Sequence, residues 1–232
     1  MDTLSLFDFD KKQAHRLGTD FLIGIDEAGR GPLAGPVVAC ACHIPPFLAD
    51  SFLDVNDSKK LTERKREELF ERLTNSNILY CVGFASAAEI DRMNILQATF
   101  LAMCRAAQKF ANTPNAIALV DGPHKAAGLK IPQHPIVDGD AKSLVIAAAS
   151  VIAKVTRDRY MATLDKIYPG YDFAVHKGYG TAKHMKALHT LGPCLEHRAS
   201  FAPISKILSS LRTLPWTPAK PAKTAKKKRS NF

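Results

Sequence analysis

The sequence has no long hydrophobic run. Its strongly apolar stretches fall short of the roughly 18 to 20 residues that a membrane-spanning helix needs, and its N-terminus lacks a basic region followed by an apolar segment. The sequence therefore indicates neither a membrane span nor a secretory signal, and we expect a cytoplasmic protein.

Cysteine is also scarce. There are five, an odd number, and four of them, Cys40, Cys42, Cys81 and Cys104, lie in apolar segments. Reduced thiols inside a core fit this placement better than a disulfide framework does. Cys40 and Cys42 are two positions apart and on a strand would simply share a face. With 232 residues, 46% of them apolar, the chain can bury a substantial core in one domain.

Acidic residues are absent from the C-terminal end. The chain has a net charge of +10, and six of its basic residues follow Pro215 with no acid among them, so residues 1–214 account for only +4. Segment 215–232, rich in Pro, Ala and Lys, has little to bury, and we expect it to be a disordered basic tail. A mobile polycation is attracted to nucleic acid without reading its sequence. A solubilising tail or a localisation signal has the same composition.

The hydrophobic pattern predicts an α/β protein. Strands are expected at 21–26, 34–44, 78–86, 116–122 and 134–140. Helices are expected from Thr62 as N-cap, over 87–111 with a longer piece from Ile95, over 143–167, and in two shorter segments at 180–192 and 203–214. Three strands, then helices, then two more strands predict a five-stranded mixed sheet flanked by helices.

Acidic residues stand at the ends of three predicted strands: Asp26 with Glu27, Asp121 and Asp140. Aspartate commonly ends a strand and opens a turn, so each acid alone carries little information. Together they can converge on one edge of the sheet, where like charges need cations to neutralise them. An oxygen-only cluster selects Mg²⁺ or Mn²⁺, and a pair of such ions about 4 Å apart suits phosphodiester cleavage.

Asp26 and Glu27 pose a geometric problem, since neighbouring residues on a strand point to opposite faces. We expect the strand to end at Asp26 and a turn to begin at Glu27. The following residues, Gly29, Arg30, Gly31 and Pro32, are typical of a turn.

The glycines also match the spacing G-x-G-x-x-A of a dinucleotide-binding fingerprint. That fingerprint requires a helix directly after the glycines. Here a predicted strand follows, so the sequence argues against a nicotinamide or flavin cofactor.

A series of motifs over residues 22–203 resembles one family. In order along the chain they are IDEAGRGPLAGPVV, NDSKKLT, MNILQAT, LVDG, AAASVIAKVTRDR, HKGYGT and HRASF. Together they resemble bacterial ribonuclease H type 2. The resemblance implies an RNase H-like fold and an endonuclease that cuts the RNA strand of RNA/DNA hybrids and incises 5′ of single ribonucleotides in duplex DNA. It implies two-metal-ion hydrolysis that leaves 5′-phosphate and 3′-hydroxyl ends.

The resemblance also assigns roles to residues. It implies metal ligands at Asp26, Glu27, Asp121 and Asp140. It implies recognition of the ribonucleotide by Gly29, Arg30, Gly31 and Tyr179. Phosphate contacts are plausible for Lys59, Lys60, Lys177 and Arg198. Each of these four could equally be a solvated surface charge, and Tyr179 could be an ordinary half-buried tyrosine. A protein senses a 2′-hydroxyl only by close approach, which glycine permits.

Asp158 competes with Asp140 for the fourth ligand position. Asp158 lies some 20 Å along the predicted helix from its start near Ser143, at about 1.5 Å per residue. We therefore choose Asp140 and expect Asp158 to pair with a neighbouring arginine. His176, His184 and His197 have no clear metal-ligand spacing, and we assign them none.

Alternatives remain for the function. Ribonuclease H type 3 resembles type 2 but usually has an extra N-terminal domain and a different residue between the two glycines, so Arg30 favours type 2. A non-catalytic nucleic-acid binder of the same fold would have no reason to keep four acids beside phosphates. We divide the chain into an N-terminal lead (1–20), a catalytic domain with C-terminal helices (21–214) and the tail, and expect a monomer.

The N-terminal lead contains a short apolar segment, TLSLF, at residues 3–7. It resembles the peptide by which bacterial repair and replication proteins bind the sliding clamp, with Thr3 where glutamine is usual. Leu4, Leu6 and Phe7 would then anchor weak clamp binding. Alternatively, these side chains dock on the surface of the protein itself, because exposed Leu and Phe are unfavourable at a mobile terminus.

Overall fold

The strands form one five-stranded mixed sheet, as predicted. The computed structural model describes residues 5–55, 61–211 and 221–222. Its strands are β1 (Leu22–Ala28), β2 (Val37–His43), β3 (Leu79–Ala85), β4 (Ile117–Asp121) and β5 (Gln133–Ile136), in the order β3-β2-β1-β4-β5. β1, β4 and β5 run parallel to one another, whereas β2 is antiparallel to both β1 and β3.

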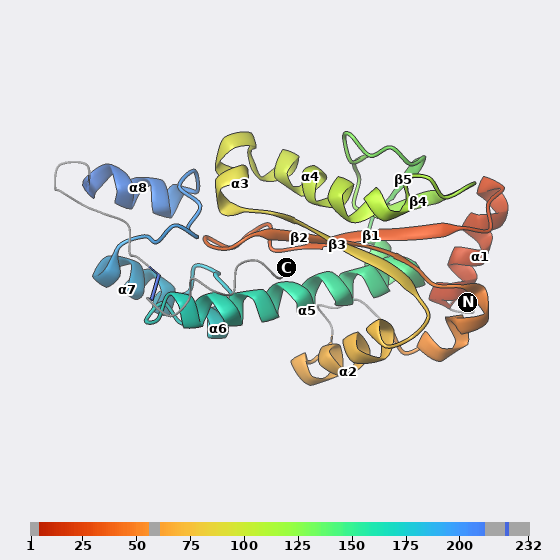
Figure 1. Cartoon of the computed structure of the whole chain (residues 1–232), viewed down its shortest axis with the longest axis horizontal. Helices are drawn as coiled ribbons and strands as arrows, with labels where there is room; N and C mark the ends of the chain where they lie inside the picture. Colours follow the sequence, from red (N-terminus) through yellow and green to blue (C-terminus); the bar gives the residue numbers. More distant parts are fainter. Residues whose placement is uncertain (1–4, 56–60, 212–220, 223–232) are drawn as a thin grey trace.

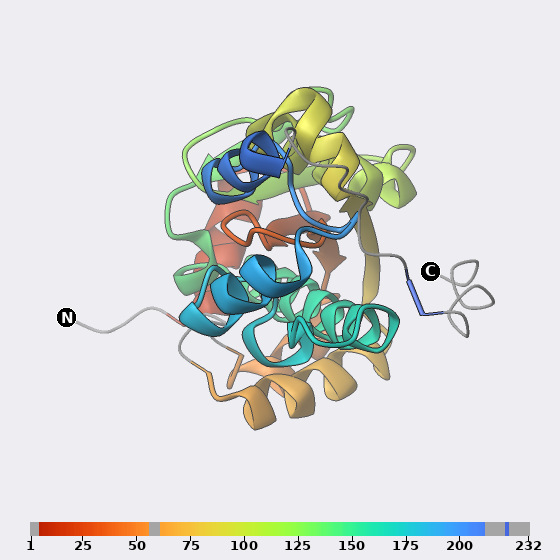
Figure 2. The ribbon, with the colours of Figure 1, turned by 90° about the vertical axis from the view of Figure 1, so that its left-hand side faces the viewer.

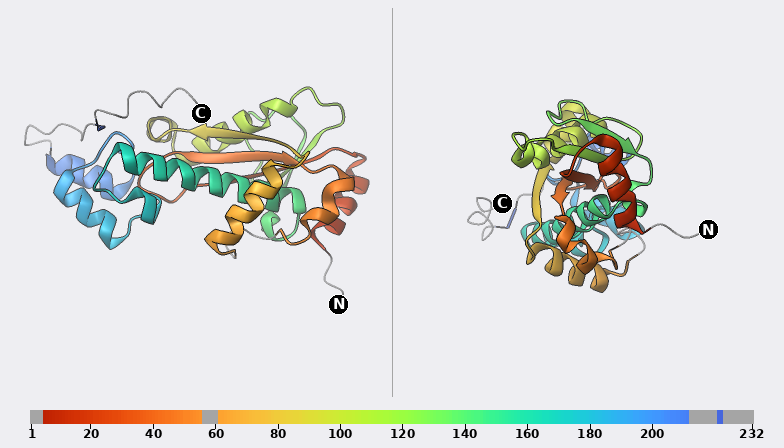
Figure 3. Two further views of the ribbon diagram at one scale, coloured as in Figure 1. Left: turned by 60° about the horizontal axis from the view of Figure 1, so that its bottom comes forward. Right: turned by 90° about the vertical axis from the view of Figure 1, so that its right-hand side faces the viewer.

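Helices cover both faces of the sheet (Figure 1). One face carries α5 (Leu144–Ile167) and α2 (Glu63–Thr74), and the other carries α3 (Ala87–Met93) and α4 (Ile95–Ala107). α1 (Leu6–Leu17) lies at one end of the molecule, and α7 (Ala182–Leu191) and α8 (Ala202–Leu211) lie at the other (Figure 3). None of the described helices has the length and apolar character needed to cross a membrane.

Local sequence explains where the helices begin. The hydroxyl of Thr62 accepts a hydrogen bond from the amide of Lys65, so Thr62 caps α2 as predicted. Ser86 and Glu89 form a reciprocal capping box at the start of α3. The helix expected from Ile95 is α4, which begins at that residue.

Some elements were not predicted. These are α1, the short helix α6 (Phe173–His176) and the 3-10 turns η1 (Pro46–Phe52), η2 (Gln108–Phe110) and η3 (Gly139–Ala141). Short turns of this kind carry too few residues to show a hydrophobic period.

The side chains of β1 alternate between two cores. Leu22 and Asp26 face α5, whereas Ile23 and Ile25 pack on the α4 side. Gly24 lies so close to α5 that an added Cβ would stand 2.1 Å from the carbonyl carbon of Val145. The backbone of α5 therefore packs directly on β1, which brings the side chains of this helix within reach of Asp26.

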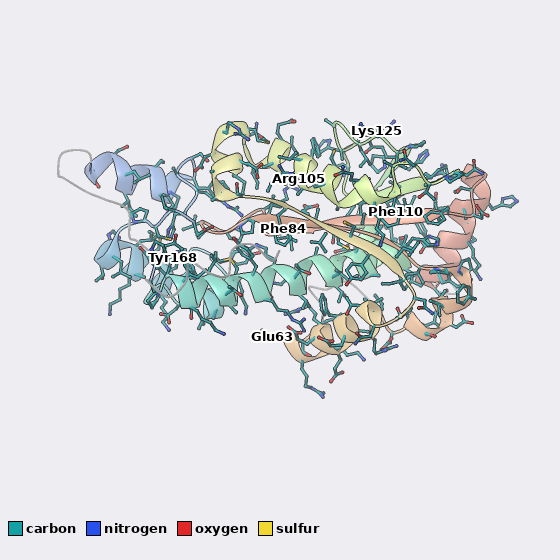
Figure 4. All side chains as sticks on the ribbon, viewed as in Figure 1. Glu63, Phe84, Arg105, Phe110, Lys125 and Tyr168 are labelled. Atoms are coloured by element: carbon teal, nitrogen blue, oxygen red, sulfur yellow. The ribbon has the colours of Figure 1, made fainter. Side chains whose placement is uncertain are left out.

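The edge strand β3 is tied to α4 through Arg105 (Figure 4). Nη1 of Arg105 donates to the carbonyl of Phe84 at 2.6 Å, and Nη2 pairs with Glu89 at 2.8 Å. The backbone carbonyl at the end of the edge strand is thus satisfied by a side chain of the covering helix.

In the described part of the N-terminal lead, α1 packs on the domain. Leu6 and Phe7 lie in the first turn of α1, half-buried against the core beneath α5. For these two residues the structure agrees with docking on the protein's own surface, while Leu4 lies outside the described residues. The basic tail also lies outside them, except for residues 221–222, where the amide of Ala222 donates to the carbonyl of Ile167 at 2.9 Å.

The expectations for the end of β1 and for the partner of Asp158 are wrong. β1 does not end at Asp26 but continues to Ala28, because Glu27 and Ala28 still pair with Ala39 and Val38 of β2. Asp158 bonds no arginine among the described residues. Its Oδ1 accepts a hydrogen bond from Nζ of Lys154 at 2.8 Å, one turn earlier on α5.

Candidate active site

Three aspartates meet beside α5. Asp26, Asp121 and Asp140 each offer a carboxylate oxygen, and these atoms lie within 4.8 Å of one another. Asp26 and Asp140 are buried and Asp121 is partly exposed. The convergence predicted from the sequence is therefore found for these three acids.

The first two acids meet because β1 and β4 are parallel neighbours. Ile25 pairs with Val120, so the next residues, Asp26 and Asp121, lie side by side at the C-terminal ends of the strands. Asp121 also shares a face with Leu119, which packs in the core beneath α5. Both carboxylates thus point toward the same helix.

Asp140 reaches the site from a turn. It lies in η3, four residues after β5 ends at Ile136, so the prediction that it ends a strand is wrong. Oδ1 of Asp121 accepts a hydrogen bond from the amide of Gly139 at 2.7 Å. A Cβ on Gly139 would stand 2.6 Å from Cδ1 of Ile146 and 3.1 Å from that same oxygen. A larger residue would press on both atoms, so glycine favours the close approach of the turn that brings Asp140 beside Asp121.

The electrostatics of the cluster favour a bound cation. Burial raises the pKa of Asp26 well above its usual value, and the nearby charges of Glu27 and Asp121 raise it further. A hydrogen bond from Ser150 opposes this shift. Three converging carboxylate oxygens, one of them on an aspartate whose ionisation is disfavoured, fit a hard divalent cation, which would neutralise them.

Glu27 lines the same cavity of about 260 Å³ but does not belong to the group of three. The continuation of β1 through Glu27 turns its side chain to the opposite face from Asp26. Its Oε1 accepts a hydrogen bond from Nη1 of Arg30 at 3.4 Å. The structure therefore places Glu27 at the cavity, beside the glycine-rich turn.

Sequence reasoning missed three residues of α5 that line this cavity: Ser150, Lys154 and Arg157. Their spacing of four and then three residues puts them on one face of the helix. Ser150 and Lys154 are polar residues one turn apart in the apolar first half of this helix, and this was a signal that could have found the stripe. Ser150 bonds Asp26, so this polar stripe is directed toward the acids.

The turn after β1 and Tyr179 lie on the other side of the cavity. Gly29, Arg30, Gly31 and Tyr179 all line it. Tyr179 is 45% exposed, and a Cβ added to Gly31 would meet its ring at 3.7 Å. Figure 2, which looks along the sheet from this end, shows the loop between β1 and β2 lying between α7 and α8. The predicted recognition residues are therefore brought together next to the acids.

Of the four residues expected to contact phosphates, the structure describes two, Arg198 and Lys177. Arg198 is fully buried and donates to backbone carbonyls of the turn, so neither a phosphate contact nor a solvated surface charge describes it. The ammonium of Lys177 lies 3.5 Å from Glu63. Lys59 and Lys60 lie outside the described residues.

The three histidines gather behind Tyr179. Nε2 atoms of His184 and His197 lie 3.0 Å apart, and the ring of His176 stacks on His184 with centroids 4.4 Å apart. Nδ1 of His184 lies 2.9 Å from the carbonyl of Tyr179, and the amide of Tyr179 donates to the carbonyl of His176 at 2.9 Å. The cluster supports the backbone of the Tyr179 loop.

Known proteins are similar to this chain in sequence and architecture. Residues 23–204 match the family described as Ribonuclease HII. Ribonuclease HII of Desulfitobacterium hafniense (strain Y51) is 52% identical over 199 residues, which cover 86% of this chain and 75% of the relative. That of Endomicrobium trichonymphae is 49% identical over 208 residues, covering 90% and 97%. The solved PCNA:RNase HII complex of Archaeoglobus fulgidus matches with a TM-score of 0.66 and 25% identity, over 81% of this chain and 96% of the archaeal one.

Fold and relatives together define an endoribonuclease of the RNase H class, which acts on RNA/DNA hybrids. Within that class, the chain belongs to the ribonuclease HII family. The resemblance of the sequence motifs to bacterial ribonuclease H type 2 and the expected RNase H-like fold are both confirmed.

Proposed function

We propose that this protein also incises duplex DNA 5′ of single embedded ribonucleotides, leaving 5′-phosphate and 3′-hydroxyl ends, with the help of two divalent cations. The observation that carries this proposal is the cavity itself. Three aspartate oxygens within 4.8 Å of one another stand beside a glycine-rich turn and an exposed tyrosine. The proposed cleavage site therefore lies next to a turn whose backbone can approach one sugar closely.

The metal ligands in this proposal are Asp26, Asp121 and Asp140, with Glu27 as the fourth. Their oxygen-only chemistry suits Mg²⁺ or Mn²⁺. When bound, such ions lower the pKa of an attacking water and stabilise charge on the leaving oxygen. The protein's own part is to hold the carboxylates, and the hydrogen bonds from Gly139 to Asp121 and from the amide of Glu27 to Asp26 support this role.

Recognition of the sugar falls to the turn and Tyr179. Gly29 and Gly31 let the backbone approach a 2′-hydroxyl, and the aromatic ring of Tyr179 can stack on the adjoining sugar. The side chain of Arg30 is 52% exposed, which leaves it accessible to a phosphate. Lys59, Lys60 and Lys177 stay as proposed phosphate contacts.

The decisive experiment is incubation of the protein with Mg²⁺ and a duplex that contains one ribonucleotide. We expect a single nick on the 5′ side of that ribonucleotide, and none in excess chelator or in an all-DNA duplex. Cleavage of a long hybrid without any nick in this substrate would restrict the activity to hybrids. Binding without cleavage of either substrate would favour the non-catalytic binder.

We also infer a sliding-clamp contact through Leu4, Leu6 and Phe7. The archaeal relative forms a complex with PCNA, which supports a clamp as partner. Because Leu6 and Phe7 pack on the core from α1, binding would require this first turn to leave the domain. A cytoplasmic monomer with a nucleic-acid-binding tail at 215–232 completes the proposal.

A further inference from the structure

Two buried arginines lie behind the turn formed by residues 29–31, which is called the recognition turn below. Arg157 comes from α5, and Arg198 comes from the segment that precedes α8. Their exposed fractions are 1% and 0%, although arginine is rarely buried completely. A charge placed this deep is costly unless its hydrogen bonds are satisfied, so a specific set of acceptors is expected around it.

The acceptors are backbone carbonyls of two loops. Arg157 donates from Nε to Pro36 at 3.0 Å, from Nη2 to Ala34 at 3.2 Å, and from Nη1 to Lys177 at 3.0 Å. The first two carbonyls belong to the loop after β1, and the third belongs to the loop that carries Tyr179. One guanidinium therefore joins the loop after β1 to the loop that carries Tyr179.

Arg198 binds the other end of the same turn. Its Nη2 donates to Gly29 at 2.6 Å and to Gly35 at 2.9 Å, Nη1 donates to Arg30 at 2.8 Å, and Nε donates to Gly35 at 3.0 Å. A guanidinium spreads five N–H donors over a planar fork and so reaches carbonyls that lie apart, whereas the three donors of an ammonium share one nitrogen.

The glycines of these loops are fitted around the guanidiniums. Gly29 has φ +95°, and a Cβ there would stand 1.9 Å from Nε of Arg157. Gly178 has φ +85°, and a Cβ there would stand 2.6 Å from the carbonyl oxygen of Ala34. The two loops also bond directly, through the amide of Leu33 and the carbonyl of Gly178 at 2.8 Å. The turn and the tyrosine loop thus form one packed unit.

We propose that Arg157 and Arg198 are positioning residues that set the separation between the Gly29–Gly31 turn and Tyr179, and thereby the discrimination of a single ribonucleotide. The proposal rests on the proposed function, since it concerns how that sugar is read. Neither arginine needs to touch the substrate. Their effect passes through the backbone of the turn, where small misplacements of a recognising group reduce the rate strongly.

Both groups keep the charge that this role requires. Burial lowers the pKa of Arg157 to about 10 and that of Arg198 to about 9. At neutral pH both guanidiniums remain protonated and can donate all of these hydrogen bonds.

The test compares Arg157→Lys and Arg198→Lys with a matched control, Arg159→Lys. Arg159 lies on the same helix but is exposed and pairs with Glu67 and Glu71. For each variant, single-turnover rates are measured on a duplex with one ribonucleotide and on a long hybrid. We expect the ratio of the two rates to fall about tenfold or more in the first two variants. The Mg²⁺ concentration for half-maximal rate and the ratio in the control should not change.

Amide hydrogen exchange supplies a readout that is independent of activity. Residues 29–36 and 177–180 should exchange faster in both buried-arginine variants, while β1 and β4 keep their protection. Should Arg157→Lys fail to fold, Gly178→Ala separates the same loops without removing a guanidinium. Unchanged exchange, or equal loss on both substrates, would overturn the proposal. If the native protein cleaves only long hybrids, the proposed function is wrong. The amide hydrogen exchange of the two loops then tests the positioning role by itself.

Discussion

The carboxylate of Asp10 accepts a hydrogen bond from the backbone amide of Val145 at 3.0 Å, across 135 positions of sequence. Asp10 is buried, and its Oδ1 has no hydrogen-bond partner among the described residues. The contact joins α1 to the first turn of α5, directly after the turn that carries Asp140. An acid here satisfies an otherwise free amide of the helix N-terminus and interacts favourably with its dipole.

The first prediction concerns the ionisation of Asp10. Burial raises its pKa to about 6, above the ordinary value of 3.8. Between pH 3.8 and pH 6 this carboxyl group is protonated in the folded state but ionised in the unfolded chain. The stability that the group contributes is therefore present below pH 3.8 and is lost as the pH rises through 6. In the native protein this loss of unfolding free energy amounts to about 3 kcal/mol at 1.36 kcal/mol per pKa unit, and Asp10→Asn should remove it. Urea unfolding at pH 4 and pH 7.5 measures the difference. An identical pH dependence in variant and native protein would contradict it.

The second prediction concerns the metal ligands. Asp121→Asn should reduce cleavage of both substrates to background, because it removes one carboxylate of the cluster. Hybrid binding should survive or strengthen, since a negative charge near phosphate is lost. The amide oxygen of the new side chain can still accept the hydrogen bond from Gly139, so the fold should persist. Full activity of this variant, or of the native protein in excess chelator, contradicts the prediction.

The third prediction concerns Tyr179 and the glycine turn. Tyr179→Ala should reduce incision at single ribonucleotides more than cleavage of long hybrids. Gly31→Ala is the suitable backbone test, because its Cβ meets only the Tyr179 ring, at 3.7 Å. Gly29→Ala is unsuitable, because its Cβ would collide with Arg157. The measurement is the cleavage rate on each of the two substrates. If Tyr179→Ala reduces both rates equally, Tyr179 does not have its assigned role.

The fourth prediction concerns acid stability. Burial, helped by the neighbouring histidines, lowers the pKa of His184 to about 4 and that of His197 to about 3. Such groups contribute stability above their unfolded pKa near 6.5, and this contribution is lost as the pH falls toward 4. At pH 4 one such histidine contributes a loss on the order of 3 kcal/mol. The native protein should therefore lose more free energy of unfolding between pH 7 and pH 4 than His197→Asn does, by about that amount, and the opposite effect of Asp10 cancels in this comparison. Equal losses in the two proteins would contradict the prediction.

The fifth prediction concerns the N-terminal segment. A peptide of residues 1–12 should bind the clamp of the same organism with micromolar affinity, and Leu6→Ala with Phe7→Ala should abolish clamp binding by the whole protein. Because both side chains pack on the core, the double variant should also lose about 1 to 3 kcal/mol of stability. The matched control is Phe47→Ala, because Phe47 is 79% exposed. It should change neither clamp binding nor the free energy of unfolding. If the native protein does not bind the clamp at high concentration, the segment is purely structural.

Local pattern was enough to predict most elements and the acids. Apolar runs of strand length ending in Asp26 and Asp121 predicted β1 and β4, and Thr62 was recognised as a helix cap because its hydrogen bond spans only three residues. Such features depend on neighbours in sequence, whose geometry is set by backbone periodicity. The family followed from motifs that are likewise local.

Tertiary structure decided where the charged side chains lie. The sequence suggested a phosphate contact or a solvated surface charge for Arg198 and gave no expectation for Asp10. Both are buried, because backbone groups far away along the chain serve as their partners. The end of β1 likewise depended on pairing with β2 and not on its own residues. Burial of a charge is set by the acceptors or donors that the fold brings to it. A sequence pattern cannot show these partners, because the residues that provide them lie more than a hundred positions away.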